Sequence, residues 1–156
     1  MSPGATGSQE YVVLPSVGSI RAISLWIYIQ PQSAQDDAYP WKYLLDARTG
    51  LGHGWISTVG NSPQTSVGSN WHRAILHDMD TGARTDISGN GLPGLELPGG
   101  KWQHIYLAAR SNFVDDVHLL GRFQASTGGM EDLAASLVSA TLWTRELTDV
   151  EVDDLA

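Results

Sequence analysis

The residues best suited to carry chemistry in this sequence are oxygen-bearing side chains close to predicted turns. Asp78 and Asp80 stand two positions apart, directly before Thr81 and Gly82. Side chains two positions apart on a strand point to the same face, so these carboxylates project together. Calcium prefers oxygen ligands drawn from neighbouring loops. Asp78 and Asp80 are therefore the leading pair for a calcium site, which Asp46, Asp86, Asn90, Asp115 and Asp116 would join if their loops meet at one rim. The alternative is that Asp and Asn serve only as turn formers.

Aromatic side chains in predicted loops indicate a second kind of site. A sugar ring stacks on a flat aromatic face and is held by neighbouring hydrogen-bonding groups. Trp71 stands between a Gly/Ser-rich loop and a strand, close to polar residues. The expected carbohydrate-binding residues are Trp71, Trp55, Trp41, Tyr39 and Arg73. The alternative for each tryptophan is a place in the core, where large aromatic residues are often found.

Catalytic motifs are missing from the sequence. A glycosidase needs two carboxyl groups at a set separation, and no glutamate here is paired with another acid on one face of a predicted central strand. No serine stands in a Gly-x-Ser-x-Gly motif, and the five histidines lack the spacing of metal ligands on a helix. We expect a protein that is not an enzyme, with glycoside hydrolysis as the third alternative after binding and self-association.

Composition places the chain among folded domains. Of its 156 residues, 42% are hydrophobic and 17% are charged, which is too apolar for a disordered chain. The formal net charge of -8 argues against nucleic acid and anionic membrane surfaces as partners. No apolar run is long enough to span a membrane, and there is no cysteine. We expect no signal peptide, because the Gly/Ser-rich residues 1–10 lack an apolar stretch. We expect a flexible segment at residues 1–9 and one domain at residues 10–156.

Period-two patterns predict that these residues are carried by strands. Residues 20–29 alternate, with isoleucine and leucine on one face and Ser24, Trp26 and Tyr28 on the other. Because the second face is aromatic, we expect it to be covered as well, and Trp26 and Trp143 to belong to the core. A capping box at residues 148–151 predicts one short C-terminal helix. Further strands are predicted at residues 11–14, 41–47, 54–59, 73–78, 84–88, 102–109, 116–124 and 136–144, with a loop at residues 60–70.

Three stretches of the chain carry a more specific pattern. They are residues 23–29 (ISLWIYI), 97–107 (LPGGKWQHIYL) and 138–152 (VSATLWTRELTDVEV). In order and spacing they resemble laminin-G-like and pentraxin-like domains of the concanavalin A-like superfamily, over residues 11–155. The resemblance implies an all-β jelly-roll sandwich of two antiparallel sheets with a short C-terminal helix. It also implies binding of glycans, proteins or steroids, often with calcium at a loop rim, and glycoside hydrolysis in some branches.

Together these observations predict a lectin-like or cell-adhesion binding module that recognises carbohydrate or an extracellular protein. Calcium is the expected cofactor, and the expected location is extracellular or at a cell surface, as part of a larger chain. Binding is expected at loops on one end of the sandwich or on its concave face. The alternative is a structural domain whose sheet edges or exposed aromatic residues mediate self-association within a larger protein or particle.

Overall fold

The architecture of the chain is given by a computed structural model. It describes residues 12–15, 18–31, 33, 41–47, 55–59, 62–114, 116–121, 123–124, 129–130 and 133–156. Within these ranges the chain is built almost entirely from antiparallel strands, with a single α-helix close to residue 156. The described residues contain no helix with the length and apolar character needed to span a membrane.

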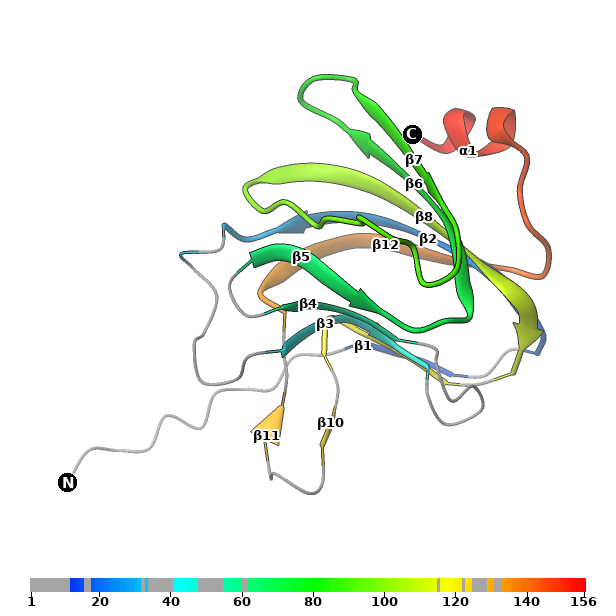
Figure 1. Cartoon of the computed structure of the whole chain (residues 1–156), viewed down its shortest axis with the longest axis horizontal. Helices are drawn as coiled ribbons and strands as arrows, with labels where there is room; N and C mark the ends of the chain where they lie inside the picture. The colour runs from blue at the N-terminus through cyan, green and yellow to red at the C-terminus, as the bar shows by residue number, and fades with distance from the viewer. Residues whose placement is uncertain are drawn as a thin grey trace.

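Two five-stranded antiparallel sheets pack face to face (Figure 1). The first sheet has the strand order β1 (Val12–Leu14), β9 (Val117–Leu119), β3 (Trp41–Asp46), β4 (Trp55–Val59) and β5 (Ser62–Val67). The second sheet has the order β12 (Ala135–Trp143), β2 (Ile20–Ile29), β8 (Lys101–Phe113), β6 (Trp71–Asp78) and β7 (Arg84–Ser88). Strands β10 (Phe123–Gln124) and β11 (Gly129–Met130) form a separate ribbon. The predicted all-β sandwich is confirmed.

Strand β2 explains why the sheets pack in this way. Its residues Ile23, Leu25 and Ile27 are fully buried and belong to one core cluster together with Leu45 and Ile56 of the first sheet. Burying a side chain of this size stabilises the fold by about 1.5 to 3 kcal/mol. The alternation predicted for residues 20–29 is therefore confirmed, and its aliphatic face holds the two layers together.

The opposite, outer face of the second sheet carries a smaller cluster beneath α1 (Asp149–Leu155). Leu147 and Val152 are buried there among residues of β2, β6 and β8. Trp26 and Trp143, which we expected in the core, lie half-buried on this outer face. At these positions each indole nitrogen finds a hydrogen-bond acceptor, which tryptophans usually do when they are buried. Trp26 donates to the Leu155 carbonyl and Trp143 donates to the Ser24 hydroxyl, both at 3.2 Å.

The start of α1 follows the predicted capping box. The hydroxyl of Thr148 accepts a hydrogen bond from the Glu151 amide at 3.3 Å, and the Glu151 carboxylate accepts one from the Thr148 amide at 2.9 Å. Hydrogen bonds from Arg145 and then from the Thr148 amide lower the pKa of Glu151 to about 2. The predicted C-terminal helix is confirmed.

Two segments differ from the prediction. Residues 60–70, expected to be a loop, contain strand β5, whose sequence is polar and includes Pro63. A proline is tolerated there because β5 ends the sheet order: among the described residues β4 is its one neighbouring strand, and its other side carries a single bridge, from Gln64 to Glu96. Residues 116–124, expected to be one strand, are divided between β9 and β10. Leu120 lies between them with φ 65°, a left-handed conformation that interrupts a strand.

Candidate functional site

A cavity of about 220 Å³ opens at one rim of the sandwich, and we call it the rim cleft. One wall of the cleft is formed by side chains on the core-facing surface of β6, β7 and β8. They are Leu76, Asp78, Thr85, Ile87, Lys101 and Gln103. The loop between β7 and β8 supplies the other side through Gly94, Glu96 and Pro98. Most of its polar groups therefore stand on strands, which hold them more rigidly than loops would.

Asp78 is held in place from three directions. Its carboxylate forms an ion pair with Lys101 and accepts hydrogen bonds from the backbone amides of Asp80 at 3.0 Å and Thr81 at 3.1 Å. The hydrogen bond from Lys101 does most to lower the pKa of Asp78, and the two amides lower it further. Asp78 is therefore a fixed, ionised acceptor that links β6 to β8 across the cleft.

Gln103 is the buried polar residue of the cleft, with only 2% of its surface exposed. Its side-chain nitrogen donates a hydrogen bond to the Pro98 carbonyl at 2.7 Å, which ties β8 to the loop. This hydrogen bond fixes the orientation of the amide group, whose oxygen can accept a hydrogen bond. That oxygen is not among the buried side-chain atoms that lack a partner, so it carries no cost of unpaired burial. The cleft therefore offers a ligand an oriented acceptor.

The residues expected to bind calcium do not meet at one point. Asp78 and Asp80 lie at the turn between β6 and β7. Asn90 follows β7 at the other end of that hairpin, where its side-chain oxygen accepts a hydrogen bond from Arg110 at 3.1 Å. The eight residues of β6 separate the two ends by about 23 Å along the strand. One calcium ion cannot span that distance.

The other expected ligands lie elsewhere. Asp46 ends β3 and Asp116 precedes β9, so both belong to the first sheet. Asp86 is engaged by Arg73 at 2.8 Å, and Asp115 lies outside the described residues. Among the described residues, no three His, Cys, Asp or Glu side chains are grouped so that they could hold a metal ion. The expected calcium cluster is thus not assembled from them.

The expected aromatic platform at Trp71 is not at the surface. Trp71 begins β6 and is fully buried, with its ring edge-on to Phe113 at a centroid distance of 5.9 Å. A sugar ring cannot reach it, so Trp71 belongs to the core, as the alternative interpretation held. Strands β3 and β4 begin at Trp41 and Trp55, but the side chains of these two residues lie outside the described parts, as does the whole of Tyr39.

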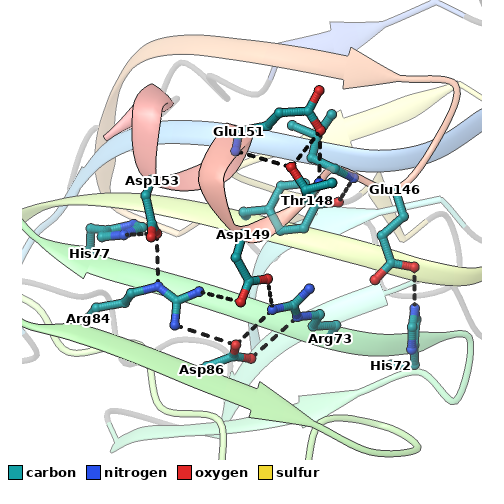
Figure 2. Close-up of polar contacts among 12 residues, drawn as sticks. His72, Arg73, His77, Arg84, Asp86, Glu146, Thr148, Asp149, Glu151 and Asp153 are labelled. Atoms are coloured by element: carbon teal, nitrogen blue, oxygen red, sulfur yellow. Dashed lines mark hydrogen bonds and ion pairs between the residues drawn. The ribbon is translucent and has the colours of Figure 1, made fainter.

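Arg73, the remaining expected ligand-binding residue, lies under α1. It belongs to a polar group that we call the helix-docking network: Arg73, His77, Arg84, Asp86, Asp149 and Asp153 (Figure 2). Arg73 bonds both Asp86 and Asp149, while Asp153 accepts from Arg84 at 2.9 Å and lies 3.0 Å from the His77 ring. Hydrogen bonding to Arg73 lowers the pKa of Asp86. Through these contacts Arg73 holds α1 on the outer face of the second sheet.

The outer face of the second sheet also carries a row of rings that the sequence analysis did not bring together. Tyr28 and Trp102 lie 5.5 Å apart, Trp26 and His104 5.6 Å, and His77 and His104 5.7 Å between ring centroids. Trp102 is 37% exposed, whereas His104 is fully buried, and neither ring nitrogen of His104 has a partner among the described residues. Burial, and then the charge of His77, lowers the pKa of His104 to about 4.

A signal for this row is present in the sequence. Trp26 and Tyr28 alternate on β2, Trp102 and His104 alternate on β8, and the two pairs are in register across the sheet. Recognising the row from sequence would have required the pairing of β2 with β8, which are far apart in the chain. Comparisons of this chain with protein-family models, with curated proteins and with solved structures find no match.

Proposed function

We propose that this chain is a non-catalytic binding domain that recognises carbohydrate at the rim cleft. The observation that carries the proposal is Gln103, a buried polar residue of the cleft whose side-chain amide is oriented by its hydrogen bond to the Pro98 carbonyl. Around it stand the ammonium group of Lys101, the carboxylate of Asp78 and the hydroxyl of Thr85, on three adjacent strands. Sugar hydroxyls both donate and accept hydrogen bonds, so they suit a mixed set of fixed donors and acceptors.

The size and the floor of the cleft support a single sugar ring as the ligand. Leu76 and Ile87 offer apolar surface to the C–H face of a pyranose, while the polar groups meet its hydroxyls. A cavity of about 220 Å³ has the volume of about seven water molecules. At about 0.3 kcal/mol for each of about twelve non-hydrogen atoms, one ring would bind with a Kd of about 2 mM. Tight binding would need several copies acting together.

The charge state of Asp78 supports binding over catalysis. A general acid needs a pKa raised toward the working pH, whereas Lys101 lowers the pKa of Asp78. Calcium is not part of the proposal, because the described residues offer no group of three His, Cys, Asp or Glu side chains that could hold a metal ion. The resemblance of three stretches of the sequence to laminin-G-like domains, which include glycan binders, supports the same function and an extracellular or cell-surface location.

Ligand-observed NMR with a panel of monosaccharides at about 10 mM tests the proposal. The informative variant is Thr85→Leu, which removes a hydroxyl and fills part of the cleft. Its matched control is Thr141→Leu, the same change at an exposed position on β12, the opposite edge strand of the same sheet. We expect binding to fall at least about tenfold in Thr85→Leu, since a filled cavity excludes the ring, and to persist in Thr141→Leu. The proposal would be contradicted if no monosaccharide of the panel bound, or if both variants lost binding equally.

Self-association is the second candidate, and the exposed aromatic end of the outer face favours it. Trp102 contacts Tyr28, and its carbonyl accepts a hydrogen bond from the amide of the exposed Met79 at 3.1 Å. Exposed aromatic and methionine side chains are enriched at protein interfaces. Light scattering over a hundredfold range of concentration separates the candidates. A rise in mass that Trp102→Ser abolishes would favour self-association, and a constant monomer mass would dismiss it.

A further inference from the structure

Glu96 occupies a fixed place in the wall of the rim cleft. Its neighbours in the chain are tied to β5, because the Leu95 carbonyl accepts from the Thr65 hydroxyl at 2.8 Å and the Leu97 amide donates to the Pro63 carbonyl at 2.7 Å. Glu96 itself forms a β-bridge with Gln64. The backbone that carries this carboxylate is therefore held from both sides, and the side chain starts from a defined position.

The charges of the cleft do not cancel. Asp78 and Lys101 neutralise one another as an ion pair. The Glu96 carboxylate has no ion-pair or hydrogen-bond partner among the residues that the structure covers. A ligand in the cleft therefore meets one uncompensated negative charge, on a chain whose formal net charge is already -8. Such a site repels anionic sugars and attracts cations.

We propose that the rim cleft prefers a saccharide with a free amino group, whose ammonium pairs with Glu96 and whose hydroxyls reach Gln103 and Asp78. This inference rests on the proposed carbohydrate-binding function and adds the charge class of the ligand. The amide oxygen of Gln103 and both carboxylates accept hydrogen bonds, so acceptors outnumber donors at the site. A donor-rich ligand suits that balance, and an ammonium group supplies three donors together with the matching charge.

The preference should be modest, because Glu96 is exposed to solvent. Exposed ion pairs shift binding constants by about 1.4-fold to fivefold, and salt reduces the effect. We therefore expect glucosamine to bind about 1.4-fold to fivefold more tightly than glucose or N-acetylglucosamine. Glucuronate should bind more weakly than glucose. The advantage of glucosamine should shrink when about 0.5 M sodium chloride is added.

Titration calorimetry or NMR with these four sugars, at about pH 6.5 where the amine is protonated, tests the inference. Glu96→Gln keeps the size of the side chain and should lower the affinity for glucosamine to the affinity for glucose measured in the same variant. Asp154→Asn is the matched control, because it removes one negative charge from an exposed side chain outside the rim cleft. It should keep the preference. Lys101→Met, which leaves Asp78 uncompensated, should raise the preference for glucosamine if it folds.

Each outcome has a distinct meaning. Equal affinity of the native chain for glucosamine and glucose would overturn the amine preference and leave carbohydrate binding intact. A preference that survives in Glu96→Gln would overturn the role of Glu96. Failure of all four sugars to bind would overturn the proposed function, and the inference with it. Thermal melting of each variant shows whether a loss of binding reflects unfolding.

Discussion

Acidification from about pH 7.5 to about pH 5 should destabilise this domain through one buried side chain, His104. Its pKa is about 4 in the folded chain, whereas the ordinary pKa of a histidine is 6.5. Between these two pH values His104 becomes protonated in the unfolded chain but stays largely neutral in the folded chain. The contribution of His104 is therefore complete above about pH 6.5 and is lost as the pH falls toward about 4. At about pH 5 the loss integrates to about 2 kcal/mol, an upper limit because water reaching the ring would reduce the shift.

The assay is urea denaturation at both pH values and constant ionic strength, for the native chain and for His104→Leu. The native chain should lose up to about 2 kcal/mol, equivalent to about 4 to 8 °C in Tm. His104→Leu should lose much less, because it has no imidazole to protonate. At about pH 7.5 the variant should be nearly as stable as the native chain, since an apolar group replaces a polar one whose ring nitrogens have no partner among the described residues.

The ion-paired aspartates contribute little to the stability change between about pH 7.5 and about pH 5. The pKa values of Asp78, Asp86 and Asp153 are lowered by their partners Lys101, Arg73 and Arg84, respectively. A lowered carboxyl pKa gives stability that is present above the ordinary value, 3.8 for Asp, and is lost only below it. An equal loss of stability in the native chain and in His104→Leu between about pH 7.5 and about pH 5 would refute the assignment to His104.

Three further predictions concern residues placed by the structure. Trp71→Ala should lower the free energy of unfolding by about 3 to 5 kcal/mol in chemical denaturation, because it opens a cavity in the core; a change below about 1 kcal/mol would contradict its burial. Thr148→Ala should cost about 1 kcal/mol through loss of the helix cap, whereas the exposed Val150→Ala should cost much less, and equal costs would argue against the cap. Lys101→Met should raise the pKa of Asp78 toward its ordinary value, measured by carbon-detected NMR titration, and an unchanged pKa would argue against the ion pair.

The sequence was most informative where one physical constraint acted on many neighbouring residues. Residues 20–29 alternate because one face must be buried, and this pattern predicted β2 from end to end. The capping box from Thr148 to Glu151 predicted the start of α1, because both of its hydrogen bonds are local. Strand β5 was missed because an edge strand needs neither apolar alternation nor freedom from proline. The division of residues 116–124 was missed because nothing about Leu120 signals a positive φ.

The rim cleft was harder to predict than the fold. Of the expected site residues whose side chains the structure describes, only Asp78 lines it, and its contact there is an ion pair with Lys101. Lys101, Gln103 and Glu96 come from a strand and a loop whose pairing depends on long-range register, which periodicity does not reveal. Trp71 was misjudged because a tryptophan next to a turn has the same local sequence whether its side chain points into the core or into solvent.

The fluorescence of Trp102 on strand β8 can report whether this strand moves when a ligand binds. Lys101 and Gln103 line the rim cleft, and Trp102 between them projects from the other side of the same sheet, where it is partly exposed. A sugar in the cleft cannot quench this indole by contact, because the thickness of the sheet separates them. A change in Trp102 emission on titration, identified by its absence in Trp102→Phe, would mean that the strand itself moves, whereas binding without it would mark the cleft as rigid and preformed.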